Sequence, residues 1–332
     1  MGKPLKAIRF HQTGGPEVLQ LEDVEIGAPQ RGQALVRHTA IGVNYIDTYH
    51  RSGLSPVPEL PSGIGVEAAG IVEEIGPNVD GLKPGDRVMY ASTPPAAPLG
   101  AYASSRVLDT DRLIPIPNGI GDCDAAALAF KGMTVEYLIR RTFPVTRGQT
   151  VLWHATAGGV GMIACQWLSA LGVEVIGTVG TEEKAELARE CGCTHTIVYT
   201  RDNFVERVRE LTNGKGVPVV FDSVGKDTFQ GSLDCLSTRG MLVSFGNSSG
   251  KPPALDIGVL SKKGSLYVTR PTIGSYTASR AELLESAGAL FEVIQRGQVR
   301  SRIGAQFDLG DAEAAHRALE SRTTTGSLIL KP

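Results

Sequence analysis

Short apolar runs separated by turn residues fill the first third of the chain. We expect strands at residues 34–40, 69–75 and 87–90, because each run contains β-branched or other apolar residues. Gly76-Pro77-Asn78 and Gly85-Asp86 supply the turns. Short strands between glycine, proline and aspartate turns are typical of a small barrel-like β domain.

The pattern changes near residue 125, where apolar strands begin to alternate with amphipathic helices. Residues 160–171 predict a helix because their apolar positions recur at the spacing of one buried face, and Gly172 is placed to end it. Helices are also expected at 182–190 and from a cap at Asp202 to Leu211, and strands at 151–154, 174–179, 196–199, 217–221 and 241–245. Repeated β-α-β units predict a doubly wound parallel sheet, so the fold class is α/β.

The tail departs from this alternation. It predicts helices at 282–296 and 311–322 and a closing strand at 326–330. We interpret it as a return to the first domain, and 332 residues is a length that suits two domains. The expected domains are residues 1–126 with 271–332, and residues 127–270.

Composition narrows the class of protein. Apolar residues make up 42% and charged residues 20%, which favours a globular protein with a sizeable core. The formal net charge of −2 does not indicate a nucleic-acid or anionic-lipid partner. No apolar run is long enough to cross a membrane and the first residues lack an apolar signal segment, so we expect a cytoplasmic protein. Five cysteines fit reduced thiols, and Cys191 and Cys193 are expected to pack at a helix end, the alternative being a metal or redox pair.

The segment Ala155–Gly161 lies between an expected strand and an expected helix. A pyrophosphate group needs close backbone approach, free N–H groups and the positive end of a helix dipole. Gly158 and Gly159 permit the approach, and Gly161 lets the helix pack on the sheet, although Thr156 stands where the usual motif has its first glycine. We predict dinucleotide binding here, the alternative being a merely tight turn.

The end of the second strand of this sheet indicates which dinucleotide. An NAD enzyme usually places an acidic side chain there to hold the ribose hydroxyls. Here Gly180 leaves room for a 2′-phosphate, Lys184 is near enough to neutralise it, and Tyr199 is expected to flank the ribose. We favour NADPH, although Glu182 or Glu183 is an alternative acidic partner for NAD.

At this point several motifs match one family. The chain resembles the zinc-independent quinone oxidoreductases, the ζ-crystallin-like branch of the medium-chain dehydrogenase/reductases, and most nearly their bacterial members. The resemblance covers nearly the whole chain and depends on Gly14–Leu19, Gly42–Tyr49, Gly65–Gly70, Ala155–Gly161, Asp222–Gly225, Ser244–Gly250 and Tyr267–Pro271.

The resemblance implies a GroES-like β-barrel catalytic domain, a Rossmann cofactor domain, an active site between them, and a homodimer paired through the edges of the cofactor-domain sheets. It implies cofactor contacts at Thr134, Phe245–Ser248, Val268–Arg270 and Arg322. With the segments discussed above, the expected cofactor site comprises Asn44, Thr134, Ala157, Gly158, Gly159, Val160, Gly161, Gly180, Thr181, Lys184, Tyr199, Ser223, Phe245, Gly246, Asn247, Ser248, Val268, Thr269, Arg270 and Arg322.

Residues that bind zinc in related alcohol dehydrogenases are replaced here. Asn44 occupies the place of their cysteine and Val66 that of their histidine. Zinc prefers thiolate, imidazole or carboxylate ligands, so we expect no metal. The proline-rich loop at 92–100, where those enzymes carry structural zinc, has no cysteine.

Without a metal to polarise an alcohol, we expect an acceptor that is already electrophilic, and we predict NADPH-dependent reduction of quinones. Asn44 is expected to hydrogen-bond the developing oxyanion or the cofactor, Tyr45 and Tyr49 to line the acceptor pocket, and Asp47 to orient a neighbouring group. Simple packing of the tyrosines and bracing of a loop by Asp47 remain the alternatives. No convincing general acid is visible, so solvent is expected to supply the proton.

Other assignments stay open. An alkenal or enone reductase would use the same hydride chemistry. The family that the chain resembles also includes RNA-binding and structural proteins, so such a role is a further alternative. His154 is expected to be a hydrogen-bonded core histidine, whereas Lys131 is expected to face either the cleft or solvent.

Overall fold

The chain divides into two units, which we call the barrel unit and the sheet unit. The computed structural model describes residues 3–94 and 98–332, so part of the proline-rich loop at 92–100 lies outside the described residues. The barrel unit runs up to Met133 and includes Tyr276–Gln295 and Arg300–Pro332, and the sheet unit comprises Thr134–Ser275 and Arg296–Val299. The functional domain boundaries expected at 126/127 and 270/271 stay a prediction.

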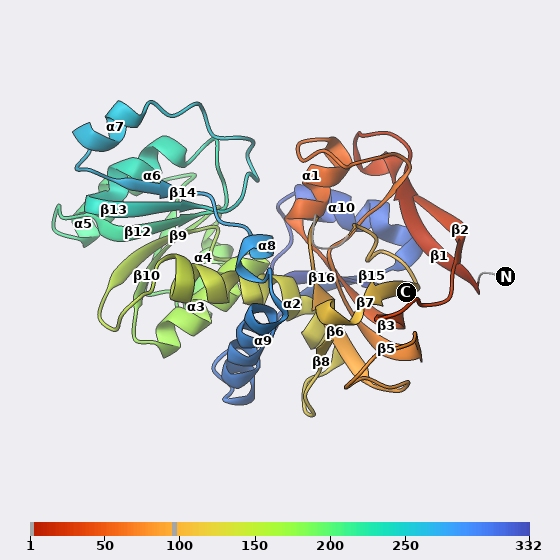
Figure 1. Ribbon diagram of the computed structural model, residues 1–332. Coiled ribbons are helices and arrows are strands. Elements are labelled where there is room, and N and C mark those ends of the chain that lie inside the picture. Colours follow the sequence, from red (N-terminus) through yellow and green to blue (C-terminus); the bar gives the residue numbers. More distant parts are fainter. Residues whose placement is uncertain (1–2, 95–97) are drawn as a thin grey trace. The chain divides into compact units, whose positions relative to one another are not determined.

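The barrel unit is built from β-strands that pair mainly antiparallel (Figure 1). A three-stranded sheet has the order β2-β1-β4, and a seven-stranded sheet has the order β15-β16-β3-β5-β6-β8 with β7 on β3. The strands are β1 (Lys3–Phe10), β2 (Gln20–Ile26), β3 (Gln33–Val43), β4 (Ser62–Gly63), β5 (Glu67–Ile75), β6 (Arg87–Ala91), β7 (Ser105–Asp109), β8 (Ile114–Pro115), β15 (Ile303–Asp308) and β16 (Ser327–Lys331). Their inward side chains, which include Phe10, Ile41 and Tyr90, form one core together with Tyr102 from the segment before β7.

The helices associated with the barrel unit are α1 (Tyr45–Ser52), α2 (Asp122–Tyr137), α9 (Arg280–Gln295) and α10 (Ala312–Glu320). The division between the units falls within α2 and again within the short α8 (Ile273–Tyr276). The tail rejoins the barrel unit because β16 pairs antiparallel with β3, Leu328 opposite Val43.

The sheet unit confirms the predicted doubly wound parallel sheet. Its strand order is β11-β10-β9-β12-β13-β14, and the ladders between neighbours are parallel. Helices α3 and α4 cover one face, and α5 and α6 cover the other (Figure 1). The elements are β9 (Thr150–His154), α3 (Gly159–Ala170), β10 (Glu174–Val179), α4 (Glu182–Glu190), β11 (His195–Val198), α5 (Phe204–Leu211), β12 (Val217–Asp222), α6 (Phe229–Cys235), β13 (Leu236–Ser244), α7 (Ile257–Lys262) and β14 (Tyr267–Thr269).

Some predicted element ends were wrong. Asn203, not Asp202, caps α5, because its side chain accepts a hydrogen bond from the backbone N–H of Val205. Strand β13 begins at Leu236 rather than 241, because Leu236 pairs with Val217 before the register shifts. Strand β11 ends at Val198, so Tyr199 follows the strand instead of closing it.

The cysteines and the helices bear on two smaller expectations. Cys193 is buried, and its thiol lies 3.5 Å from the carbonyl of Val175 and 3.2 Å from that of His195, which confirms its packing role. All five cysteines are free thiols. Among the described residues, no helix has the length and apolar character needed to cross a membrane.

Candidate active site

Asn44 links the end of β3 to the start of α1. Its backbone is extended, and the residue is buried with 4% of its surface exposed. The carboxylate Oδ2 of Asp47 accepts a hydrogen bond from the Asn44 backbone N–H at 2.8 Å. An Asn-x-x-Asp sequence therefore stabilises the first turn of α1 locally, because Asp47 satisfies a donor that the helix leaves without a partner.

Glu67, the first residue of β5, orients the Asn44 amide. Its Oε1 accepts a hydrogen bond from Asn44 Nδ2 at 2.7 Å and pairs with Lys131 Nζ at 2.9 Å. The Phe130 backbone N–H donates to its Oε2. Glycine is required at position 42 because a Cβ there would lie 2.1 Å from Glu67 Oε1. An amide nitrogen carries two hydrogens, so Asn44 retains a second N–H for another acceptor.

Lys131 is buried, so of its two expected positions the solvent-facing one is wrong, and the cleft-facing one stays a prediction. Its side chain is 6% exposed and pairs with a Glu67 side chain that is fully buried. The ammonium and the Asn44 amide therefore converge on one carboxylate oxygen, which neutralises the buried charge of Glu67.

Asp47 also belongs to a larger buried set of polar side chains in the barrel unit. Tyr102 Oη donates to Asp47 Oδ2 at 2.9 Å and lies 3.1 Å from His316 Nε2. Arg51 Nη1 lies 2.9 Å from His316 Nδ1, and the Arg51 guanidinium also binds the Glu320 carboxylate at 2.8 and 3.0 Å.

Burial sets the charge states in this set. Desolvation raises the pKa of Asp47 to about 7, although hydrogen bonds from the Asn44 backbone and Tyr102 lower it. Desolvation, with a smaller contribution from Arg51, lowers the pKa of His316 to about 3. His316 is therefore neutral near pH 7, whereas Asp47 is close to its midpoint.

Tyr45 and Tyr49 lie one helical turn apart on α1 and contact each other. Their ring centroids are 5.9 Å apart and tilted by 57°. Tyr49 is buried and Tyr45 is partly exposed. Their role in lining an acceptor pocket stays a prediction.

The turn from β9 into α3 has the backbone that an anion site needs. Gly158 caps α3 with extended backbone, so the first N–H groups of a 12-residue helix point out of its N-terminus. A Cβ on Gly161 would lie 2.4 Å from the Ala155 carbonyl oxygen, which explains the glycine there. Ala155 itself has a left-handed backbone with φ of 58°. This geometry fits the pyrophosphate of a dinucleotide.

Gly180, Thr181, Lys184 and Tyr199 gather where β10 and β11 end. A Cβ on Gly180 would lie 3.0 Å from the Tyr199 hydroxyl, which places these two residues side by side. Thr181 caps α4 by accepting a hydrogen bond from the Lys184 backbone N–H at 3.3 Å. The alternative partner Glu182 is engaged by Arg189 at 3.2 Å and Arg201 at 3.7 Å. Lys184 therefore lies in the first turn of α4, as predicted.

A second group forms at the carboxyl ends of β12, β13 and β14. Ser248 donates its backbone N–H to the Ser223 carbonyl at 3.2 Å, and a Cβ on Gly246 would lie 2.4 Å from the same oxygen. Arg270 Nη1 donates to the carbonyls of Ser244 and Gly246, each at 3.0 Å. Val268 and Thr269 lie within β14, and Arg270 follows it directly.

His154 is a buried core histidine, as predicted. Its Nδ1 lies 2.9 Å from Thr178 Oγ1 and its Nε2 lies 3.0 Å from Ser232 Oγ. Ser232 in turn donates to the Asp222 carboxylate at 2.9 Å, and Asp222 accepts from the backbone N–H groups of Val224 and Gly225. These hydrogen bonds join the ends of β10, β9 and β12, from which the expected cofactor loops leave.

The remaining predicted residues are scattered through both units. Phe245 packs its ring 5.6 Å from Trp153, and Asn247 follows in the same loop. Thr134 is buried in α2, and Arg322 follows α10 with φ of 59°. Ala157, Gly159 and Val160 lie in the turn and first residues of α3. Their roles toward a cofactor stay predictions.

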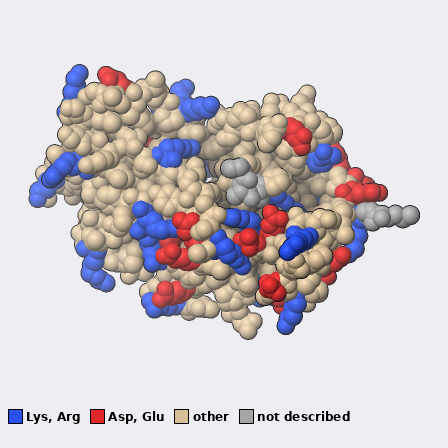
Figure 2. Space-filling view, in the orientation of Figure 1, with Lys and Arg blue, Asp and Glu red and all other residues tan. Residues whose placement is uncertain are grey.

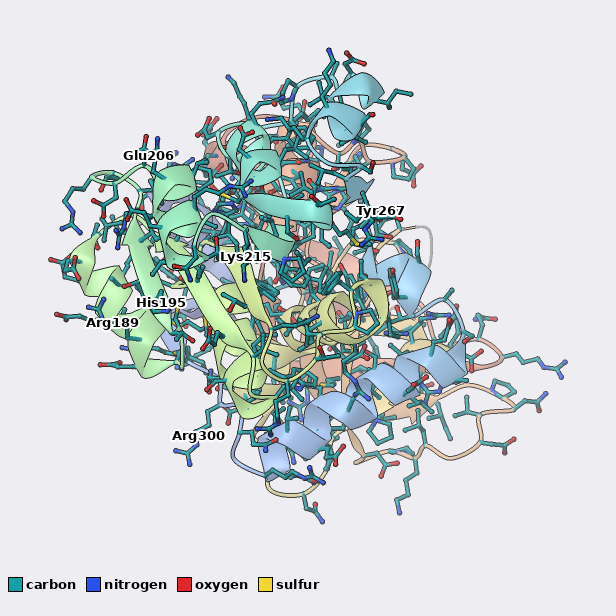
Figure 3. All side chains as sticks on the ribbon, turned by 90° about the vertical axis from the view of Figure 1, so that its left-hand side faces the viewer. Arg189, His195, Glu206, Lys215, Tyr267 and Arg300 are labelled. Carbon is teal, nitrogen blue, oxygen red and sulfur yellow. The ribbon has the colours of Figure 1, made fainter. Side chains whose placement is uncertain are left out.

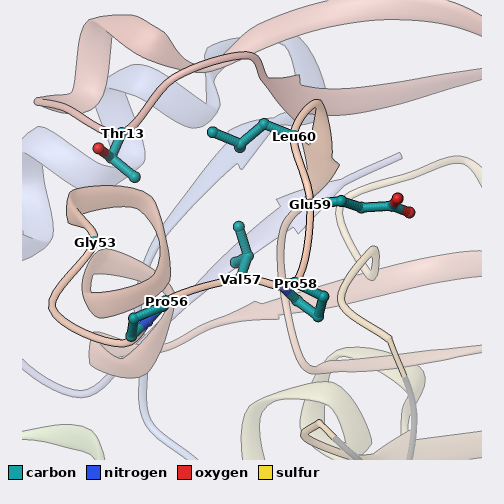
Figure 4. A pocket seen from close by; sticks show the side chains of 7 residues that line it. All are labelled: Thr13, Gly53, Pro56, Val57, Pro58, Glu59 and Leu60. Atoms are coloured by element: carbon teal, nitrogen blue, oxygen red, sulfur yellow. The ribbon is translucent and has the colours of Figure 1, made fainter.

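A pocket of about 440 Å³ in the barrel unit lies at the other end of α1 (Figure 4). Val57 and Leu60 point into it, whereas Glu59 points away. Its lining residues are Thr13, Gly53, Pro56, Val57, Pro58, Glu59 and Leu60, and none of them was predicted for the site.

Sequence reasoning missed four residues of the cluster around Asn44 and Asp47, namely Arg51, Glu67, Tyr102 and His316. Glu67 lies in the motif Gly65–Gly70, where it is a carboxyl group within an apolar run. That pattern could have indicated a functional residue. Tyr102 and His316 carry no local signal, because their partners lie far away in the chain.

Family comparisons agree with this architecture. Residues 30–118 match the alcohol dehydrogenase GroES-like domain, and residues 159–296 match the zinc-binding dehydrogenase family. The chain is 52% identical over 327 residues to a quinone oxidoreductase of Pseudomonas aeruginosa, covering 98% of this chain and 99% of that protein. It is 45% identical to a 2-haloacrylate reductase of a Burkholderia species, and the match covers 97% of this chain and 98% of that protein.

A solved structure extends the likeness to three dimensions. The crystal structure of Escherichia coli quinone oxidoreductase complexed with NADPH has a TM-score of 0.96 and 48% identity, covering 98% of this chain and 100% of that one.

The residues present do not fit the zinc that one of these family descriptions names. Asn44 is a neutral amide, Val66 has no donor atom, and both oxygens of Glu67 accept hydrogen bonds within the protein. Across residues 3–94 and 98–332, no three side chains of histidine, cysteine, aspartate or glutamate group to hold a metal ion. The metal-free expectation stays a prediction. The fold, the motifs and the full-length relatives together show that the chain belongs to the quinone oxidoreductase family of the medium-chain dehydrogenase/reductases.

Proposed function

We propose that this chain reduces small-molecule quinones by hydride transfer from NADPH, without zinc. The observation that carries the proposal is the turn from β9 to α3, where Gly158 opens the helix and Gly161 packs against Ala155. The relatives named above, one of them crystallised with NADPH, support the choice of cofactor and substrate.

The chain would bind the two phosphate groups of the cofactor through different chemistry. Backbone N–H groups at the start of α3 would hold the pyrophosphate. Lys184 would pair with the 2′-phosphate in the space that Gly180 leaves beside Tyr199. Ser223, Gly246, Ser248 and Arg270 form a hydrogen-bonded group that suits the nicotinamide half.

NADPH, when bound, supplies a hydride to an acceptor that can carry negative charge on oxygen. The second N–H of Asn44 would donate to that oxygen as the charge develops, with Glu67 holding the amide in place. Tyr45 and Tyr49 would pack against the flat acceptor ring. Solvent would supply the proton that completes the hydroquinone.

We infer further that the protein is a cytoplasmic homodimer that pairs through β14. This strand closes one edge of the sheet unit, whereas β11, which carries His195, closes the other (Figure 3). Tyr267 on β14 is 58% exposed, and Ile257 on the neighbouring α7 is 78% exposed. An exposed apolar edge strand is a ready site for pairing with a second sheet. Light scattering during size-exclusion chromatography measures the mass directly.

An enone or alkenal reductase is the second candidate, because a 2-haloacrylate reductase is 45% identical to this chain. Both reactions place a hydride on an electron-poor double-bond system, so the same residues would serve either. An RNA-binding or structural role has less support. On the face that Figure 2 shows, basic and acidic side chains lie intermixed instead of forming one basic stripe.

Steady-state oxidation of NADPH tests the function. We expect turnover with benzoquinones and naphthoquinones, slower turnover with 2-haloacrylates and alkenals, and preference for NADPH over NADH. Prior treatment with a chelator should leave the rate unchanged, and elemental analysis should find no stoichiometric zinc. Turnover of alkenals without turnover of quinones would overturn the quinone assignment.

A further inference from the structure

Asp47 stands at the end of a hydrogen-bond chain that runs in one direction. A guanidinium only donates, so Arg51 Nη1 donates to His316 Nδ1, 2.9 Å away. The neutral ring then carries its hydrogen on Nε2 and donates to Tyr102 Oη at 3.1 Å. The hydroxyl hydrogen of Tyr102 goes to Asp47 Oδ2 at 2.9 Å. Each donor in the chain therefore faces an acceptor.

These hydrogen bonds connect α10 and the segment before β7 to α1 and to Asn44, the residue that precedes α1. Asp47 and Arg51 come from α1, His316 from α10, and Tyr102 from the segment before β7. Arg51, Tyr102 and His316 are at most 2% exposed. The last acceptor, Asp47 Oδ2, also takes the backbone N–H of Asn44, so the chain ends at the residue that carries the candidate catalytic amide.

The second oxygen of Asp47 marks this carboxyl group as unusual. Oδ1 is buried, and no described residue forms a hydrogen bond with it. A buried carboxylate with one bare oxygen is costly, which favours protonation on that oxygen.

Besides desolvation, four neighbouring groups affect the pKa of Asp47. Glu67 of β5 raises the pKa of Asp47, whereas Lys131 of α2 and the hydrogen bonds from Asn44 and Tyr102 lower it. Desolvation outweighs all of these and raises that pKa to about 7. Tyr102 also contacts neutral His316, which in turn contacts Arg51 of the Arg51–Glu320 ion pair.

We propose that Asp47 is a positioning residue for the reaction, which acts through Asn44 and is itself held by the Arg51–His316–Tyr102 chain. This inference rests on the proposed function. The ionised carboxylate accepts strongly from the Asn44 backbone and keeps the amide at its place. Protonation weakens that hydrogen bond, so the rate falls as the pH drops below the midpoint of Asp47.

The pH profile of kcat/KM for a benzoquinone at saturating NADPH tests the proposal, between about pH 5.5 and 8.5. The unchanged protein should lose activity on the acid side with a midpoint near that of Asp47. Asp47→Asn should lack this limb and remain at the low-pH level throughout. Tyr102→Phe removes a bond that favours the carboxylate, so its limb should move up by about one pH unit.

Tyr90→Phe is the matched control. Tyr90 is another fully buried tyrosine of the barrel unit, and its hydroxyl lies 3.2 Å from His38 Nε2. Like Tyr102→Phe, this variant removes the hydroxyl group of a tyrosine that contacts a histidine. Tyr90, however, forms no hydrogen bond with Asp47. Its limb should stay where it is in the unchanged protein.

A second readout does not depend on turnover. In ¹⁵N-labelled protein, the backbone amide signal of Asn44 should titrate with the same midpoint as the rate, shift upward with it in Tyr102→Phe, and not titrate in Asp47→Asn. An amide that titrates while the rate ignores pH would refute the positioning role. A limb that survives in Asp47→Asn, or shifts equally in Tyr90→Phe and Tyr102→Phe, would also refute it. Absence of any quinone turnover in the unchanged protein would instead refute the proposed function, and this is measured first.

Discussion

The buried side chain of Glu67 connects three partners at once and holds the Asn44 amide in place. Its carboxylate accepts from the Asn44 amide, the Lys131 ammonium and the Phe130 backbone N–H while being fully buried. Removing one partner of such a pair leaves a buried charge without compensation, which typically costs about 3–5 kcal/mol. The orientation of Asn44 therefore depends on residues from two other elements, β5 and α2.

Lys184 is the residue that should separate NADPH from NADH. We expect Lys184→Glu to weaken NADPH binding by about 1–3 kcal/mol, the range for losing a charge-assisted phosphate contact, and to leave NADH hardly affected. Quenching of protein fluorescence on titration with each cofactor measures both affinities.

Lys215→Glu serves as the control for that variant. Lys215 is an exposed lysine of the same sheet unit and follows α5 (Figure 3). Lys215→Glu changes the net charge by the same amount as Lys184→Glu, but at a place where no phosphate is expected. Equal weakening of both cofactors in Lys184→Glu would show that this residue is not the phosphate anchor.

Site residues differ in how far sequence could predict them. Asn44 and Asp47 are three residues apart, so their local hydrogen bond follows from the start of a helix. Tyr102 and His316 are 214 residues apart, so no local pattern relates them. Only the docking of α10 in the barrel unit brings them together.

At the scale of elements, the turn between β9 and α3 depends on the absence of side chains. The helix can approach the strand end only if position 161 has no Cβ, because the Ala155 carbonyl occupies that space. The amphipathic pattern of 160–171 predicted α3 to within one residue at each end, since one face is buried along its whole length. Strand ends were harder, because register with a neighbour decides them, as for Leu236 in β13.

Gly161→Ala should therefore damage both stability and cofactor binding. The added methyl group would force the helix or the Ala155 turn to shift, which typically costs about 1–3 kcal/mol. We expect a lower free energy of unfolding in urea and a larger dissociation constant for NADPH.

Gly288→Ala makes the same chemical change within α9, where a Cβ would meet no atom within 4 Å. Alanine is favoured over glycine inside a helix by about 0.5–1 kcal/mol, so this variant should be slightly more stable. Unchanged stability and NADPH affinity in Gly161→Ala would contradict the close packing described here.

At the scale of the whole molecule, buried titratable groups make stability depend on pH. Burial lowers the pKa of His38 from 6.5 to about 4 and that of His316 to about 3. Between about pH 4 and 6.5 the unfolded chain binds their protons and the folded one does not, so each contributes stability that grows with pH. Asp47 acts in the opposite direction between its ordinary pKa of 3.8 and about 7, because burial makes the folded state hold the proton more tightly.

Burial also lowers the pKa values of His50 and His154, so the histidines together outweigh one carboxyl group. The free energy of unfolding should therefore rise from pH 4.5 to 6.5. Each group changes it by about 1.4 kcal/mol per pH unit while its two states differ in protonation. Asp47→Asn removes the opposing contribution, so the rise should become steeper by about that amount. Urea denaturation at several pH values measures the slope. A flat or shallower curve in Asp47→Asn would show that this carboxyl group does not carry the raised pKa.

The sequence by itself determined the two classes of element, the parallel α/β sheet, the glycine turn for a dinucleotide and the local cap that Asp47 gives Asn44. These features depend on residues close together in the chain, where spacing and side-chain type decide the backbone. Only the tertiary structure decided that Glu67 holds the Asn44 amide with Lys131, and that Arg51 contacts His316 across 265 residues. Such contacts arise from strand register and helix docking, and the buried polar groups that they pair have no local pattern in the sequence.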